Sequence, residues 1–230
     1  IRYNTRKLFM KILAIAPHPD DETLGCGGTL YKHKAEGDEI YWLIVTGISE
    51  DTGWANDAVI KRDNEMNAVS KKYGFSDVFN LRLPTTKIDT LPLSDLIEKI
   101  TDVYKNIKPD VIYIPFSYDV HTDHQIIAKA LQSTFKWFRY PHIKNIYMYE
   151  TPSETEFNFV ENRVFRPNVF INISQYLENK IETMKIYASE FGEHPFPRSE
   201  KALRALATLR GAQSGYEAAE AFELVYERNE

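Results

Sequence analysis

Short apolar runs alternate with amphipathic stretches over the first 150 residues of the chain. The apolar runs have the length of strands and are rich in Ile, Val, Leu, Trp and Tyr; they cover residues 11–16, 39–45, 78–83, 110–115 and 144–149. The stretches with helical periodicity cover residues 23–35, 56–73, 93–107 and 125–137. This alternation predicts an α/β fold with a parallel sheet that is flanked by helices on both faces.

The C-terminal third has a less regular pattern. It contains one strand-like run at residues 169–173 and two helical stretches at residues 175–187 and 200–210. Residues 191–197 between those helices hold Gly192, Pro195 and Pro197, so this segment cannot continue a helix. The sequence shows no internal repeat and no long linker. We therefore expect a single domain over residues 10–230, with the C-terminal third as an added layer or lid.

The first nine residues carry three basic side chains, as the start of a signal peptide does. The apolar run that follows is interrupted by Lys11, however, and no cleavage site of small residues comes after it. We interpret Met10 as the natural start and residues 1–9 as a non-native or poorly ordered extension.

Composition narrows the class of protein. A hydrophobic content of 43% argues against a disordered chain, and a mean hydropathy of −0.41 without a long uncharged apolar run argues against a transmembrane segment. The formal net charge of −5 offers no attraction for nucleic acid. Cys26 is the only cysteine, which excludes an internal disulfide and a cysteine-rich zinc cluster and favours a reducing, cytoplasmic location.

Side chains of metal-ligand type follow two of the predicted strands. The first strand is followed by His18, Asp20, Asp21 and Glu22, and the fourth by Asp119, His121, Asp123 and His124. The carboxyl ends of parallel strands share one edge of the sheet, where ligands bind. A spacing of three residues also lets the members of a pair, such as His18 and Asp21, converge at the start of a helix.

Two imidazoles and one carboxylate suit Zn²⁺, with one coordination position left open as in catalytic zinc sites. Mg²⁺ and Ca²⁺ prefer oxygen ligands only. We place His18 and His124 on this metal. Taken alone, Glu22 is more typical of a helix cap, and a lone His-x-x-His is more often structural; the position of both motifs directly after strands favours the metal site.

The small residues 25–28, Gly-Cys-Gly-Gly, match neither the dinucleotide nor the P-loop pattern. We interpret them as allowing a helix to pack closely on the sheet, with Cys26 buried. The sequence has no G-x-S-x-G elbow, which argues against a serine hydrolase.

Residues 17–25, Pro-His-Pro-Asp-Asp-Glu-Thr-Leu-Gly, and residues 121–124, His-Thr-Asp-His, resemble the two signature motifs of the LmbE/PIG-L family of zinc-dependent N-deacetylases. The resemblance extends to residues 62–65 and 215–223, and so covers nearly the whole chain from Met10. It implies a Rossmann-like fold and removal of the acetyl group from an N-acetylglucosamine-type amine.

The resemblance also implies roles for particular residues. The implied zinc ligands are His18, Asp21 and His124. Asp20 would act as the general base on a water molecule. His121 would stabilise or protonate the tetrahedral intermediate, and Asp123 would orient His121.

The substrate contacts that the sequence suggests each have an alternative. Arg62 matches a family position that reaches the polar end of the substrate, but an ion pair with Glu65 on the same helix explains it equally well. Glu50 follows the second strand and would accept hydrogen bonds from sugar hydroxyl groups, or else be a solvated loop carboxylate. Tyr118 is the nearest tyrosine to the second motif.

We thus expect a cytoplasmic zinc-dependent hydrolase that acts on an N-acetylated sugar or glycoconjugate. The alternatives are a zinc amidase for another N-acyl amine and a sugar-binding module without catalysis; Asp20 argues against the module, because binding alone needs no base. Members of the family often assemble, so a homo-oligomer is a further expectation.

Overall fold

The computed structural model describes residues 9–229, and the expectation for residues 1–8 lies outside this part of the chain. Its strands are β1 (Lys11–Ala16), β2 (Glu39–Gly47), β3 (Asp77–Pro84), β4 (Val111–Pro115), β5 (Asn145–Tyr149), β6 (Val169–Asn172) and β7 (Ala219–Glu227). They form one sheet in the order β3-β2-β1-β4-β5-β7-β6. The strands β1 to β5 pair in parallel, whereas β7 is antiparallel to both β5 and β6.

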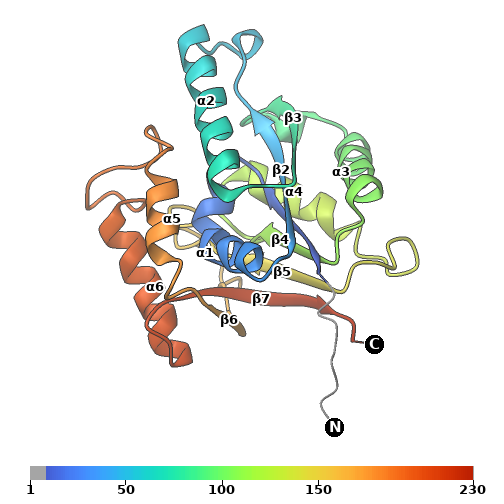
Figure 1. Ribbon diagram of the computed structural model, residues 1–230. Coiled ribbons are helices and arrows are strands. Elements are labelled where there is room, and N and C mark those ends of the chain that lie inside the picture. The colour runs from blue at the N-terminus through green and yellow to red at the C-terminus, as the bar shows by residue number, and fades with distance from the viewer. Residues whose placement is uncertain (1–8, 230) are drawn as a thin grey trace.

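Helices cover both faces of this sheet, as the alternating pattern predicts. They are α1 (Asp21–Ala35), α2 (Asn56–Tyr73), α3 (Leu93–Ile107), α4 (Thr122–Gln132), α5 (Leu177–Met184) and α6 (Glu200–Ser214). Figure 1 shows α3 and α4 on one side of the sheet and α1, α2, α5 and α6 on the other, and each side has its own buried apolar cluster. None of the helices in residues 9–229 combines the length and the apolar character needed to cross a bilayer.

The structure differs from the sequence prediction in the bounds of several elements and in one additional strand. α1 begins at Asp21, two residues early, and α4 ends at Gln132 instead of residue 137. Beyond Gln132, the Thr134 hydroxyl donates to the Leu131 carbonyl at 2.6 Å, a local bond that competes with helix continuation. β7 was not predicted from the sequence; it pairs with β5 and β6, so part of the C-terminal third continues the sheet instead of covering it.

β1 is the strand at which the order of the sheet reverses. It pairs with β2 on one side and with β4 on the other, so the chain after β1 turns away from the chain after β4. In open α/β sheets, ligands bind in the crevice that opens at such a point, beyond the carboxyl ends of the strands. The His and Asp residues that follow β1 and β4 therefore meet at this crevice.

α1 is kinked at Cys26, whose φ of −138° and ψ of 21° are not helical. Other elements satisfy the backbone groups that the kink leaves free: Lys180 Nζ donates to the Leu24 carbonyl at 2.8 Å, and the amides of residues 28–29 donate to the Glu220 carboxylate at 2.9 and 2.7 Å. Lys180 and Glu220 are buried and pair with each other at 2.6 Å. Because a buried charge needs a partner, this pair fixes α5 and β7 to the kink.

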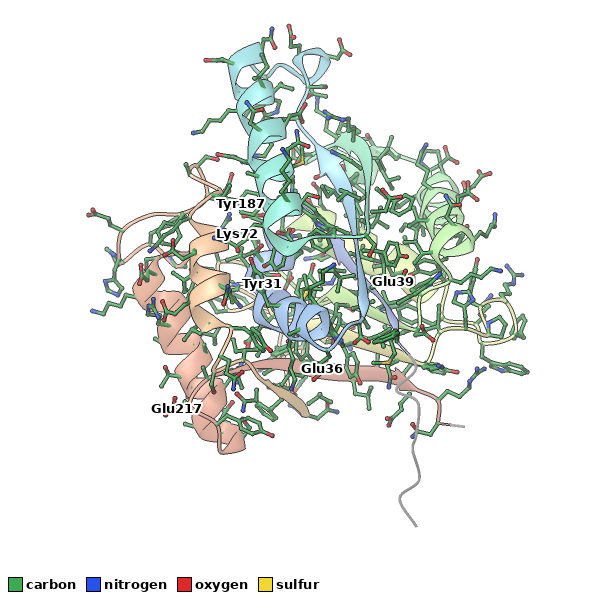
Figure 2. All side chains as sticks on the ribbon, viewed as in Figure 1. Tyr31, Glu36, Glu39, Lys72, Tyr187 and Glu217 are labelled. Atoms are coloured by element: carbon green, nitrogen blue, oxygen red, sulfur yellow. The ribbon has the colours of Figure 1, made fainter. Side chains whose placement is uncertain are left out.

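Two tyrosines, both labelled in Figure 2, also link α1 to the segment around α5. The Tyr31 hydroxyl lies 2.6 Å from the Thr183 hydroxyl, and the Tyr187 hydroxyl donates to Glu22 Oε1 at 2.9 Å. Glu22 is fully buried, and burial raises its pKa to about 7 although hydrogen bonds oppose the shift. Its Oε2 accepts the Asp20 amide at 3.1 Å, in agreement with the interpretation of Glu22 as a helix cap.

Gly25 lies against the ring of Tyr149 on β5. A Cβ atom at Gly25 would be 2.1 Å from Tyr149 Cδ2, closer than any real contact, and the Tyr149 hydroxyl is itself held by the Ile15 carbonyl at 2.8 Å. This confirms that small residues here allow α1 to approach the sheet.

We therefore expect Gly25→Ala to destabilise the fold by overpacking, by about 1–3 kcal/mol in the free energy of unfolding. Gly47→Ala is the matched control, since its Cβ would meet its nearest atom, Arg82 Cα, at an ordinary 3.5 Å. Denaturant unfolding of both variants measures the difference. Equal stability of the two would contradict the close packing of α1.

Candidate active site

Three ligand-type atoms converge at the crevice beyond β1 and β4. Asp21 Oδ2 lies 3.3 Å from His18 Nδ1 and 3.2 Å from His124 Nε2, and these two nitrogens are 3.3 Å apart. Asp21 is the first residue of α1, His124 lies in the first turn of α4, and His18 lies in the loop that joins β1 to α1. This set, within reach of one ion, suits a metal.

A carboxylate holds the far nitrogen of each imidazole. His124 Nδ1 lies 2.8 Å from Asp119 Oδ2, and Asp119 Oδ1 accepts the Thr155 hydroxyl at 2.6 Å. His18 Nε2 lies 3.1 Å from Asp123 Oδ2. Carboxylates that hold the outer nitrogen of a histidine in this way orient metal-binding imidazoles and fix their tautomer.

The charges of the three convergent groups depend on one another. Burial lowers the pKa of His18, but hydrogen bonds to Asp123 and Asp21 outweigh it and raise the pKa to about 9. Burial likewise opposes the charge of His124, yet Asp21 and Asp119 hold its pKa well above the usual value. Burial alone would raise the pKa of Asp21, and the two imidazoles instead lower it well below its usual range.

His121 is the N-cap residue of α4, and it faces the same crevice. Its Nδ1 accepts the Asp123 amide at 3.1 Å, so the neutral ring carries its proton on Nε2. Burial lowers the pKa of His121 to about 4, and the neighbouring imidazoles His18 and His124 add to the effect. His121 is therefore neutral at physiological pH.

Among residues 9–229 the carboxylate of Asp123 forms no hydrogen bond with His121, so its contacts here differ from the orienting role that the resemblance implied. Its Oδ2 accepts the Thr86 amide at 2.7 Å in addition to its contact with His18. The hydrogen bond that Asp123 makes with His121 comes from its backbone amide. The reason is the geometry of the α4 start, where the amide two residues after an N-cap points back at the capping side chain.

Asp20 and Asp21 point to different partners. The φ of Asp20 is 132°, a strained region for a residue with a side chain, and such strain is common at functional sites. Asp20 Oδ2 forms an ion pair with Arg198 Nη1 at 2.8 Å. Burial and the neighbouring Asp21 charge raise the pKa of Asp20 well above its usual value, and Arg198 opposes that shift.

A cavity of about 250 Å³ opens over these groups. His18, Asp20, Asp21 and His121 line its end at β1, and Trp54, Asp63 and Arg82 line another part of its wall. Arg82 Nη2 donates to both carboxylate oxygens of Asp63, at 3.0 and 3.1 Å, in an exposed ion pair. The cavity thus joins a cluster of titratable groups to a half-exposed indole and polar side chains.

The two predicted substrate contacts differ in position. Arg62 lines the cavity, but its guanidinium donates to the Pro19 carbonyl at 3.1 Å and pairs with Glu190 and Glu65. The ion-pair alternative thus describes its contacts in this structure. Glu50 is exposed in a short 3₁₀ turn and is absent from the lining of this cavity, as a solvated loop carboxylate would be.

Four residues of the site received no role from the sequence: Asp119, which was named only as a side chain of ligand type, and Glu154, Glu190 and Arg198, which were not singled out. Asp119 stands two residues before His121, so its place in the cluster was a usable signal. The other three lie beyond β5 in irregular segments, and only the fold brings them to the cavity. Tyr118 does not line the cavity; the Arg163 guanidinium lies over its ring, with Cζ 4.7 Å from the ring centroid.

Two curated proteins are similar in sequence to most of this chain. One is the diacetylchitobiose deacetylase of Thermococcus kodakarensis, 25% identical over 94% of this chain and 83% of that protein. The other is the uncharacterised deacetylase YaiS of Escherichia coli, 31% identical over 77% of this chain and 90% of that protein.

Solved structures share the fold. The N,N′-diacetylchitobiose deacetylase of Pyrococcus horikoshii superposes with a TM-score of 0.76 at 21% identity, over 94% of this chain and 84% of that one. The 4-carboxy-2-hydroxymuconate hydratase GalB of Pseudomonas putida, which is not a deacetylase by name, superposes with a TM-score of 0.73 at 18% identity, over 96% of this chain and 98% of that one. The fold alone therefore does not specify the reaction.

The family model described as GlcNAc-PI de-N-acetylase matches residues 13–135, which is more than half of the chain and includes both motifs. The chain belongs to the PIG-L (LmbE-like) family.

Proposed function

We propose that this protein is a zinc-dependent N-deacetylase that hydrolyses the acetamide group of an N-acetylglucosamine-type sugar or glycoconjugate. The observation that carries the proposal is the convergence of His18 Nδ1, Asp21 Oδ2 and His124 Nε2 within 3.3 Å of one another, at a cavity that also holds the Asp20 carboxylate. Family membership and the two deacetylase relatives support it.

The residues present fit a zinc ion. His18, Asp21 and His124 would hold it, since two imidazole nitrogens and one carboxylate oxygen are typical zinc ligands and leave a position open. The contacts of Asp119 and Asp123 with the outer nitrogens supply the orientation that such ligands need. When bound, the ion supplies Lewis acidity, which acidifies water and polarises a carbonyl oxygen.

Asp20 is the group that takes the proton from the attacking water. It lies in the cavity, its Oδ1 has no hydrogen-bond partner among residues 9–229, and its raised pKa makes it a stronger base than an exposed aspartate. The C–N bond breaks after the water oxygen has bonded to the acetyl carbon. The proton on Asp20 then passes to the leaving amine, so that acetate and a free amine result.

His121 is suited to stabilise the negative oxygen that develops on the acetyl carbonyl. It is neutral and carries its proton on Nε2, so it can donate a hydrogen bond without first taking up a proton. Of the two roles that the sequence analysis left open, stabilisation thus fits this geometry better than proton transfer.

The cavity wall suits a sugar ring. The indole of Trp54, 48% exposed, offers a flat apolar face, and the adjacent Asp63–Arg82 pair offers both acceptors and donors for hydroxyl groups. An uncharged N-acetylated sugar needs this combination of stacking surface and polar partners.

The function is tested by acetate release from three probes: N-acetylglucosamine, N,N′-diacetylchitobiose and a non-sugar N-acetyl amine. We expect release from at least one sugar probe, complete loss after removal of metal with a chelator, and recovery with one equivalent of zinc. Release from the non-sugar amine alone would indicate a different amidase. Binding of the sugars without acetate release would indicate a binding module, and full activity in metal-free protein would contradict the zinc site.

Separate replacement of Asp20 and Asp21 tests which carboxylate is the general base and which is the zinc ligand. Asp20→Asn should retain zinc but lower kcat by about 10²-fold or more, because an amide cannot accept the proton. Asp21→Ala should weaken zinc binding by more than about 100-fold, since loss of an outer-shell partner alone costs 10- to 100-fold. Zinc content and acetate release are measured on both variants. Loss of metal in Asp20→Asn with metal retained in Asp21→Ala would show that Asp20 is the ligand and Asp21 the base.

A further inference from the structure

Glu190 and Arg198 stand on either side of the turn-rich segment 191–197 and contact each other at its base. Arg198 Nη1 lies 2.8 Å from Glu190 Oε2, and Glu190 also pairs with Arg62 on α2. Both residues line the cavity. The segment that enters α6 is therefore fixed to the rim of the site through charged contacts and not through apolar packing alone.

The guanidinium of Arg198 is held from three separate parts of the chain. Its Nε donates to the Ser153 hydroxyl at 2.8 Å, while Nη1 contacts both Glu190 and Asp20 at 2.8 Å. A planar guanidinium bound at several of its donors has little freedom to rotate. Arg198 consequently presents a fixed donor to Asp20 Oδ2.

Asp20 needs such a partner to stay in place. Its carboxylate is almost completely buried beside that of Asp21, so like-charge repulsion and loss of water both disfavour it there. Arg198 donates a hydrogen bond to Asp20 Oδ2, and Asp20 Oδ1 has no hydrogen-bond partner in the described part of the chain. The contact thus determines which carboxylate oxygen is available to the cavity.

We propose that Arg198 is a positioning residue that holds the Asp20 carboxylate in the orientation required for proton abstraction, so that the segment after α5 completes the catalytic site. This rests on the proposed function, in which Asp20 is the base. Arg198 acts through Asp20 and not on the substrate itself.

A double-mutant cycle with N,N′-diacetylchitobiose as the probe tests this role, or N-acetylglucosamine if only that sugar is hydrolysed. Arg198→Gln should lower kcat by about 10- to 100-fold with little change in KM or zinc content, as loss of an orienting partner does. Arg198→Lys retains the positive charge and should recover part of this loss. In the Asp20→Asn background, Arg198→Gln should change kcat by less than about twofold, because its target is already removed.

Arg204→Ala is the matched control, because Arg204 on α6 forms ion pairs with Glu178 on α5 and with Glu200 and does not line the cavity. It should keep the wild-type kcat. An unchanged kcat in Arg198→Gln would overturn the proposal, and so would an equal loss in both backgrounds, which would place Arg198 on the substrate. If Arg198→Gln fails to fold, Arg198→Lys decides, since a Lys variant that folds and shows the same loss in both backgrounds also overturns it. A wild type that releases no acetate from any probe would instead overturn the proposed function, and this role with it.

Discussion

The buried carboxylate of Asp21 is the interaction on which the arrangement of the site depends. One oxygen of this side chain lies within 3.3 Å of two imidazole nitrogens and also accepts the His18 amide at 2.8 Å. A buried carboxylate is unfavourable unless positive charge and hydrogen bonds surround it. Asp21 therefore requires both His18 after β1 and His124 on α4, and it joins the two strand ends at the point where the order of the sheet reverses. Asp119 and Asp123 extend the same constraint outward, because each holds the other nitrogen of one imidazole.

The C-terminal third stabilises this centre through buried polar contacts. Lys180 and Glu220 satisfy the backbone at the kink of α1, and Tyr187 binds Glu22 in the first turn of the same helix. Arg198 contacts Asp20 directly before that helix. Thus α1, which carries Asp21 at its first position, is held from the sheet on one side and from the later segments on the other. A layer of this kind contributes to the site as well as covering the sheet.

The helices and strands with clear hydrophobic periodicity were predictable from the sequence. The convergence of the motifs at residues 17–25 and 121–124 was predictable as well. Residues 11–16 and 110–115 read as strands because they are short and apolar, and the position of His18 and His124 after them follows from parallel topology. β7 was missed because buried Glu220 and small alanines interrupt the apolar pattern that marks a strand. Arg198 and Glu190 were missed because no local pattern distinguishes a charged residue that faces a cavity from one that faces solvent. The resemblance implied that Asp123 orients His121, whereas its carboxylate contacts His18 and the Thr86 amide here, because a sequence motif shows that residues are close but not which atoms meet.

Zinc titration of the metal-free protein by calorimetry, in buffers with different enthalpies of ionisation, tests the metal centre most directly. In the metal-free protein the pKa of His18 is raised to about 9 and that of His124 lies above its usual value, so these imidazoles hold a proton at pH 7 that the metal must displace. Zinc binds only neutral imidazole, so binding of one ion per chain at pH 7 should release at least about one proton, and the affinity should rise with pH until about pH 9. Binding that releases no protons and does not vary between pH 6 and about pH 9, or that persists unchanged in Asp21→Ala, would contradict a metal site made of His18, Asp21 and His124.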